Sequence, residues 1–341
     1  MSWMHRLRIL GMTAVLPLLV GNVFAWGVEG HKAIAEIARG RLNIKARAAV
    51  SELLGNDDLA AVAVWADEAR SAVFHKGPLA SDPEAHHFNE AFPHNQNWHF
   101  VNLPLGLAYD PNGLFSSKDD VVHAINRCVA VLEGRSEELS RELALKLLIH
   151  FVGDLHQPLH AASGYYDLSD LEMPKLVTDP ARVNISTSDR GANDLHFGRS
   201  EELHAYWDDT LVEMQGAGRD YLALAVRIAG RPEGVVRASD ELIVPTLNFV
   251  ATHDAGSWSW QTPGDYHGWA AAWATESSAA ARAAYEGITF GKATLGRSGQ
   301  LMRIEIRLPD GYAERSEPVV AERLHRAGAR LAELLNRILG A

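Results

Sequence analysis

The chain has almost no cysteine: Cys128 is the only one among its 341 residues. No disulfide can form within the chain, so its stability does not come from a disulfide framework. Bound metal ions can supply comparable stiffening, because a metal site couples ligand geometry to folding. The sequence also has no Ser/His/Asp or Cys/His pattern typical of a side-chain nucleophile.

The chain also lacks a run of basic residues. It contains 32 Lys and Arg against 43 Asp and Glu, a net charge of −11. Without residues 1–25, which contain Arg6 and Arg8, the count is 30 against 43 and the net charge is −13. This balance gives no surface suited to duplex DNA. An acidic protein can still bind an anion where metal ions reverse the local sign.

The chain has no hydrophobic run long enough to be a convincing membrane span. The apolar stretch 9–20 follows Arg6 and Arg8, and small residues stand at Val23 and Ala25. This arrangement is typical of a secretory signal with cleavage before Trp26. We therefore expect residues 1–25 to be a signal peptide and the mature protein to be secreted or periplasmic.

The full chain is 47% hydrophobic and 22% charged, enough to bury a large core. Its apolar spacing predicts a mainly α protein, and no repeat of 20–50 residues is evident. Helices are expected at 32–42, 46–54, 57–71, 119–132, 136–155, 219–228, 238–250, 266–285 and 318–339. The alternating segment 301–308 predicts one strand of a small β-hairpin. Residues 74–97 are expected to be irregular, with His75, His86, His87 and His94 outside any core site.

The richest chemistry lies at His150 and Asp154, four residues apart on one face of a predicted helix. Pro158 ends that helix, and His160 follows it, free to point at a neighbouring ion. A single His-x3-Asp pair is more often a surface hydrogen bond. His204 and Asp208 repeat the same spacing, however, and two such pairs in one chain seldom arise by chance. Imidazole and carboxylate ligands suit zinc.

Two further candidates have ordinary alternatives. Asp67 and Arg70 share a helix face, where a simple ion pair is the usual explanation. His99 lies between aromatic residues, where a buried structural histidine is the usual explanation. His156 lies on another face of the helix that carries His150, and we expect only hydrogen bonding or packing from it.

The motif HFxxDxxQPLH at 150–160, followed by LHxxWD at 203–208, resembles the zinc-dependent single-strand-specific nucleases of the S-one/P-one family, relatives of zinc-dependent phospholipase C. The resemblance runs from Trp26 to the C-terminal helix. It implies a mainly α, single-domain helical fold over residues 26–341, with a small β-hairpin at most.

The resemblance also implies three bound Zn²⁺ ions. The first would be held by Asp67, His99, His150 and Asp154. The second would be held by His160, His204 and Asp208. The third would be held by Trp26, through its terminal amine and carbonyl, together with His31 and Asp154. Asp154 would then bridge the first and third ions.

By the same resemblance, Asp67, Arg70 and Asp154 are the catalytic residues, and a metal-activated water attacks phosphorus. Arg70 would contact the phosphate, and Phe100, Asn193 and Asp209 would contact the substrate. Core packing explains Phe100 equally well.

The implied activity is hydrolysis of single-stranded RNA and DNA to 5′-phosphorylated products, with 3′-nucleotidase activity, by a monomer that does not bind duplex DNA. The alternatives are a phospholipase C and a non-catalytic exported zinc-binding protein.

The sequence departs from the family pattern at three places. Ala192 replaces the second glycine of Arg-Gly-Gly-Asn, and Asp209 stands where an asparagine often helps hold the base. The segment 165–188 is longer than the usual connection, and we expect it to cover the cleft or alter substrate choice. The disulfides of eukaryotic members are missing.

Overall fold

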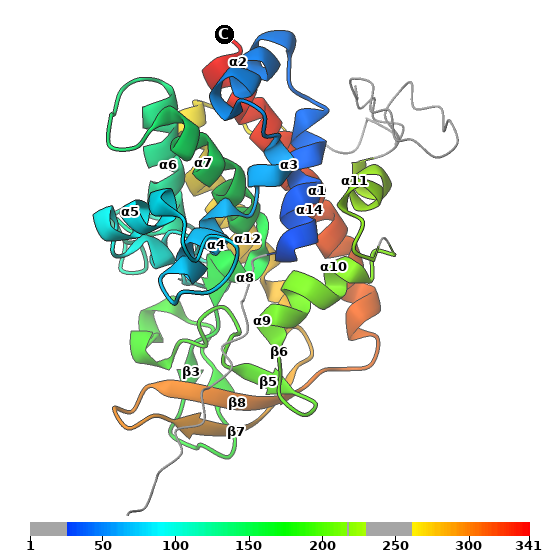
Figure 1. Cartoon of the computed structure of the whole chain (residues 1–341). Coiled ribbons are helices and arrows are strands. Elements are labelled where there is room, and N and C mark those ends of the chain that lie inside the picture. Colours follow the sequence, from blue (N-terminus) through cyan, green and yellow to red (C-terminus); the bar gives the residue numbers. More distant parts are fainter. Residues whose placement is uncertain (1–25, 217, 230–260) are drawn as a thin grey trace, which may run out of the picture.

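The protein is mainly α, as its sequence predicts. The computed structural model describes residues 26–216, 218–229 and 261–341. Figure 1 shows the helices gathered above a smaller region of strands. A continuous hydrophobic core extends through these residues, from Trp26 to Leu335. No helix among the described residues is long and apolar enough to cross a bilayer.

Three helices form the centre: α1 (Gly27–Arg39), α7 (Arg141–His156) and α14 (Tyr312–Leu339). Every residue of α7 from Leu143 to His156 is buried, and Ser140 caps its first turn by accepting the amide of Leu143. Helix α14 can approach α1 closely because Gly328 lies there; a Cβ at that position would come within 2.5 Å of Ile37. The predicted metal ligands on α1 and α7 are therefore carried by helices that are packed in the core.

Shorter helices surround this centre. They are α2 (Ile44–Leu54), α3 (Leu59–Val62), α4 (Trp65–Ala72), α5 (Pro83–Ala91), α6 (Val121–Leu132), α8 (Pro158–Ala161), α9 (Leu203–Ala205), α10 (Leu211–Glu213), α11 (Tyr221–Ala229), α12 (Trp269–Ala280) and α13 (Arg282–Tyr285). The 3₁₀ turns are η1 (Asn95–Asn97), η2 (Pro180–Arg182), η3 (Ile185–Thr187) and η5 (Tyr266–Gly268), and η4 (Tyr206–Thr210) is a π-helical turn.

Several helix boundaries differ from those predicted. Helix α1 begins at Gly27, so His31 lies within it and not at its start. The segment 74–97 is not irregular throughout, because α5 forms there with Asp82 as its cap and Pro83 in its first turn. Helix α6 begins at Val121 and not at residue 119, with Asp120 as its cap, whose side chain accepts the amide of His123. The helix expected at 238–250 lies outside the described residues.

The helix expected at 57–71 is in fact two helices, α3 and α4, separated at Ala63 and Val64. The interruption has a use: the carbonyl oxygen of Ala63 accepts a hydrogen bond from the His150 ring at 2.8 Å. Apolar spacing alone does not reveal this break, because its reason lies in a residue 87 positions away.

The predicted hairpin exists, as β7 (Thr289–Leu295) and β8 (Leu301–Arg307). The β structure goes beyond it, since β5 (Leu195–Phe197) pairs in parallel with β8, and β6 (Glu201–Glu202) pairs with β5. The sheet order is β6-β5-β8-β7. Two smaller pairs are β1 (Leu103–Pro104) with β2 (Ala162–Ser163), and β3 (Tyr166–Asp167) with β4 (Lys175–Leu176). Short strands such as β5 and β6 are set by these distant partners.

A buried charged cluster fastens α12 to α14. Glu276 accepts hydrogen bonds from Arg323 and from Arg330, the latter at 2.6 Å, and Arg326 lies 2.8 Å from it. The backbone oxygen of His156 accepts from Arg323 at 3.0 Å, and its ring lies 3.1 Å from Arg330. The packing and hydrogen-bonding role expected for His156 is confirmed.

Candidate metal centre

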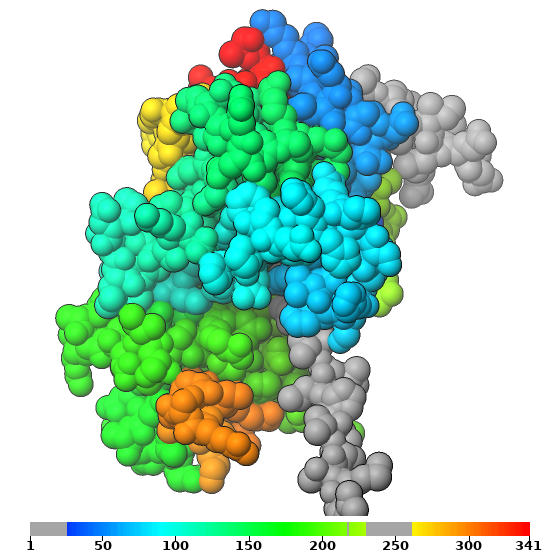
Figure 2. Space-filling view, turned by 60° about the vertical axis from the view of Figure 1, so that its left-hand side comes forward, coloured from blue at the N-terminus to red at the C-terminus, as the bar shows by residue number. Residues whose placement is uncertain are grey.

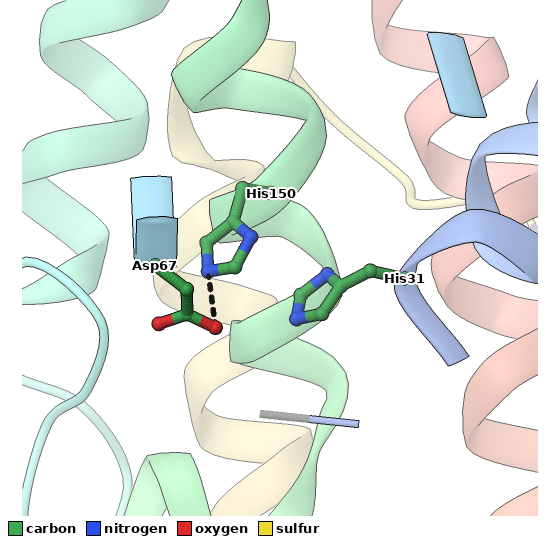
Figure 3. A group of neighbouring side chains, drawn as sticks. All are labelled: His31, Asp67 and His150. Carbon is green, nitrogen blue, oxygen red and sulfur yellow. Dashed lines mark ion pairs between the residues drawn. The ribbon is translucent and has the colours of Figure 1, made fainter. Parts of the chain in front are cut away.

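Helix α7 brings His150 and Asp154 to one buried face, each with 0% exposure. The Nδ1 atom of His150 lies 2.8 Å from the Ala63 carbonyl, which can only accept, so Nδ1 carries the proton. Nε2 then points at carboxylates, 3.2 Å from Asp154 Oδ2 and 3.6 Å from Asp67 Oδ2. Figure 3 shows Asp67 and His150 facing each other, with His31 alongside.

His99 and His31 complete this first group. His99 Nδ1 lies 2.9 Å from Asp154 Oδ2 and 3.6 Å from Asp67 Oδ1. His31 Nε2 lies 3.2 Å from Asp154 Oδ1, and its ring stacks on that of His150 with centroids 4.0 Å apart. We call these residues the first group: His31, Asp67, His99, His150 and Asp154. They come from α1, α4, α7 and the segment after η1.

The second group consists of His160, His204 and Asp208, from α8, α9 and the π-helical turn η4. The two Nε2 atoms are 3.0 Å apart, and Asp208 Oδ2 lies 3.2 Å from that of His204. Both Nδ1 atoms face backbone carbonyls, of His99 at 2.8 Å and Gly191 at 2.6 Å. In the neutral rings, both Nε2 lone pairs therefore point into the same small space.

Trp26 is anchored next to both groups. Its indole donates to the Gly153 carbonyl at 2.9 Å, and its own carbonyl accepts the Gly30 amide at 3.0 Å. Its backbone nitrogen lies 3.2 Å from Asp208 Oδ1. The structure thus joins His31 to Asp154 as expected, and places the Trp26 nitrogen beside a residue of the second group.

Burial and mutual charge set the protonation of these side chains. Burial lowers the pKa of His31, of His160 and of His99, the last to about 4. For His150, burial opposes the charged form, but Asp154 and Asp67 raise its pKa to about 9. Burial likewise opposes ionisation of Asp154, yet the charge of His150 holds the pKa of that carboxyl well below its usual range. The carboxylate is thus available as a ligand.

Several buried atoms of the two groups lack hydrogen-bond partners within the described part of the chain. Among the described residues none is found for Asp67 Oδ2, Asp154 Oδ1, Asp208 Oδ2 or either ring nitrogen of His31. Leaving such an atom unsatisfied costs about 1–3 kcal/mol, and more when it is charged. A divalent cation would satisfy them together.

Three sets of ligand atoms converge to within 4.8 Å: His31, Asp67 and His150; His99, His150 and Asp154; and His160, His204 and Asp208. Imidazole nitrogen and carboxylate oxygen are donors that zinc accepts. The side chains present therefore fit the metal that the sequence implies.

The four residues expected to contact the substrate differ in their exposure and in their contacts with the two groups. Arg70 Nη2 lies 2.8 Å from Asp67 Oδ1, and the side chain is 28% exposed, so it reaches both the first group and solvent. Phe100 is half-buried directly after His99. Asp209 packs against Gly27, where an added Cβ would lie 2.4 Å from its carboxylate oxygen, and burial with the Asp208 charge raises its pKa to about 6. Asn193 donates to the Arg190 carbonyl of its own turn at 2.7 Å.

Three residues that position the predicted metal ligands were not predicted from the sequence. Gln157 donates to Asp208 Oδ1 at 2.6 Å and accepts the Leu159 amide. Gly153 leaves room for His31, whose ring nitrogen would lie 2.7 Å from a Cβ at that position. The residue before a proline at a helix start is a natural cap, so the sequence could have indicated the capping role of Gln157. No local pattern indicates the role of Gly153.

The third is Asp189, a fully buried carboxylate. It accepts hydrogen bonds from the Tyr166 hydroxyl at 2.9 Å, and from the amides of Gly164 and Ala192 at 3.0 Å each. These bonds fix the turn whose Gly191 carbonyl orients His204. Burial raises the pKa of Asp189 to about 6 despite the hydrogen bonds. The segment 165–188 is thus tied to the second group through Asp189.

The histidines of the segment 74–97 stay apart from these groups, as expected, although His86 and His87 lie in α5 and not in a loop. The ligand sets found among the described residues do not include His75, His86, His87 or His94. His75 and His86 lie near each other, with ring centroids 6.1 Å apart.

The fold and site define a helical protein with a buried centre of histidines and aspartates able to hold metal ions. Residues 26–340 match the model of the S1/P1 Nuclease family. The chain therefore belongs to this family and is a nuclease, a hydrolase that acts on nucleic acid.

Similar proteins carry the same description. The chain is 27% identical to Endonuclease 2 of Arabidopsis thaliana, covering 96% of each chain. It is 24% identical to Nuclease S1 of Aspergillus oryzae, covering 97% of this chain and 98% of the relative. Nuclease P1 of Penicillium citrinum matches at 27% over 40% of this chain and 47% of its own.

Proposed function

We propose that this nuclease is an exported, zinc-dependent enzyme that hydrolyses single-stranded RNA and DNA to 5′-phosphorylated products and also acts as a 3′-nucleotidase. Residues 26–341 would be its single domain, after removal of residues 1–25. The observation that carries the proposal is the pair of buried groups whose carboxylate oxygens and imidazole nitrogens converge, several of them without hydrogen-bond partners among the described residues.

Three zinc ions would be held by these side chains. One would bind Asp67, His99, His150 and Asp154, one would bind His160, His204 and Asp208, and one would bind Trp26, His31 and Asp154. Zinc supplies positive charge and lowers the pKa of bound water toward neutrality. Three ions would outweigh the three carboxylates, so an acidic protein would present a positive pocket to phosphate.

The protein's own side chains would position the substrate. Arg70 is held by Asp67 at 2.8 Å while remaining partly exposed, so its guanidinium can donate hydrogen bonds to a phosphate oxygen without moving far. Its charge would stabilise the extra negative charge of the transition state. Asp67 and Asp154 would be catalytic through the ions that they hold.

Single-strand preference would come from unpaired bases. Phe100 follows His99 and is half-buried, so one face of its ring is available for stacking. Asp209 and Asn193 would contact the base edge. A base that is stacked within a duplex cannot reach such a platform.

A panel of substrates tests the activity. The purified protein is given a single-stranded oligonucleotide, the matching duplex, a nucleoside 3′-monophosphate and phosphatidylcholine, each before and after chelation and again after zinc is returned. We expect zinc-dependent cleavage of the first and third substrates. Cleavage of the lipid alone would indicate a phospholipase C, and bound zinc without turnover would indicate a zinc-binding protein.

The role of Trp26 has its own test. A free α-amino group has a pKa of about 7.7–8.0 and must lose its proton to bind metal. A protein with one extra residue before Trp26 should bind less zinc than the protein that starts at Trp26. Equal zinc content and equal activity would overturn this part of the proposal.

A further inference from the structure

An exposed aromatic ring lies close to the site in sequence. Phe74 is 68% exposed and its neighbour Val73 is 52% exposed. Among the strongly exposed large hydrophobic side chains of the described residues, Phe74 is the only aromatic one. Phe74 and Val73 are adjacent, so they form a small exposed apolar patch, the kind of surface that can contact a ligand.

Phe74 continues the functional face of α4. Asp67, Arg70 and Phe74 are spaced by three and four residues, the spacing of neighbours on one side of a helix. Phe74 lies two residues past the end of α4, in the turn that closes the helix, four residues after Arg70. The face thus runs from a buried carboxylate, through a partly exposed guanidinium, to an exposed ring.

The turn that carries Phe74 is ordered by its own backbone. The amide of Phe74 donates to Ser71 at 3.1 Å, that of His75 to Ala72 at 2.9 Å and that of Lys76 to Ser71 at 3.3 Å. His75 occupies the left-handed region, with φ 54°, and closes the helix as glycine usually does. The ring is therefore presented on a fixed turn.

The same turn is cationic in an acidic protein. Lys76 is exposed and makes no ion pair with any described residue, while the chain as a whole carries a net charge of −11. His75 is also exposed, beside His86. The segment that holds α4 and α5, light blue to cyan in Figure 2, lies on the outer surface of the molecule. An aromatic ring beside a basic side chain such as Lys76 is a usual platform for single-stranded nucleic acid.

We propose that Phe74 is a base-stacking subsite for the nucleotide next to the phosphate held by Arg70, with Lys76 contacting the following phosphate. The subsite extends the proposed function, on which it rests, from the scissile nucleotide to its neighbour along the strand. A long substrate would use it fully, and a mononucleotide would scarcely reach it.

The test compares F74A, F74W and the control I44A in the zinc-loaded protein. Ile44 is 89% exposed at the start of α2, away from α4 in the fold, so I44A removes a similar exposed apolar side chain. For each variant kcat/KM is measured on oligonucleotides of increasing length and on a nucleoside 3′-monophosphate. We expect F74A to lose about 5- to 150-fold on long substrates, the range of one lost base stack, with a loss that shrinks as the substrate shortens. F74W and I44A should behave as the wild type.

A loss in F74A that does not depend on length would indicate general damage and overturn the subsite, as would no loss at all. Binding of a labelled phosphorothioate oligonucleotide, followed by anisotropy, separates the two proposals. If the wild type fails to cleave single strands yet binds them through Phe74, the proposed activity fails and the subsite stands. If F74A weakens only the binding of phosphatidylcholine vesicles, the surface recognises lipid and the subsite is wrong.

Discussion

Two charged regions of this protein differ in how their polar atoms are satisfied. Around Glu276, arginines from α14 supply positive charge on several sides, and the carboxylate is fully hydrogen-bonded. In the two metal groups, carboxylates face histidines, and several oxygens and ring nitrogens are left without partners among the described residues. In the first region, protein donors alone satisfy both oxygens of the carboxylate. The second becomes complete only when a cation is added.

The difference shows how to separate structural charge from functional charge. A buried ion pair with matched hydrogen bonds can be explained by the contact between α12 and α14. Buried acceptors that converge without donors cannot be explained by folding, because they oppose it. Changes in the Glu276 cluster should therefore affect stability, and changes in the metal groups should affect metal content and catalysis.

The largest expected effect is that of D154N. Asp154 lies within 3.2 Å of ring nitrogens of His31, His99 and His150, closer than Asp67 lies to any histidine. We expect activity to fall on the order of 10³-fold or more, the scale for removing a charge that stabilises the transition state. Bound zinc, measured by atomic absorption, should fall by more than one ion per chain. Full activity in this variant would show that Asp154 does not bridge two ions.

E276Q should show the opposite pattern. The Arg323 side chain is only 2% exposed, so losing its carboxylate partner leaves a buried charge unpaired. Such losses range from about 3 to 5 kcal/mol, and we expect the low end because Glu276 is 32% exposed. Urea unfolding measures the change, and zinc content should stay normal. The control is E172Q, which removes an exposed ion pair with Lys292 and should change stability by less than about 1 kcal/mol.

D189N should affect only the second group. Asp189 does not face the metal ligands directly but holds the turn whose Gly191 carbonyl orients His204. Loss of a residue that orients a ligand lowers metal affinity or activity by about 10- to 100-fold. Zinc titration should show one weakened ion with the others unchanged, which general unfolding would not produce. D167N, on the exposed end of β3, is the matched control.

The smallest effect is a pH dependence. The charges of Arg330, Arg323 and Arg326 hold the pKa of Glu276 well below its usual 4.5, although burial acts the other way. A carboxylate with a lowered folded pKa stabilises the protein above its unfolded pKa and loses that contribution as pH falls. The stability gap between wild type and E276Q should therefore be widest above about pH 5 and narrow below pH 4.5. A gap that widens toward acid would contradict this account.

The sequence predicts what is local and repetitive. The two His-x3-Asp pairs, the central helix and the hairpin of β7 and β8 follow from spacing, and all are present. The break at Ala63 and the pairing of β5 with β8 depend on contacts distant in the chain, and local patterns do not report them. Asp189 and Gly153 were missed for the same reason, since each serves a ligand that the sequence places elsewhere.

His99 takes part in both groups. Its ring faces Asp154 in the first, while its carbonyl oxygen accepts the Nδ1 proton of His160 in the second. An ion bound to the His99 ring also restrains the His99 backbone, whose carbonyl accepts the hydrogen bond of His160. Such coupling acts equally in both directions. The backbone at His99 thus links the two groups, so that ordering a ligand of the first group also positions a ligand of the second.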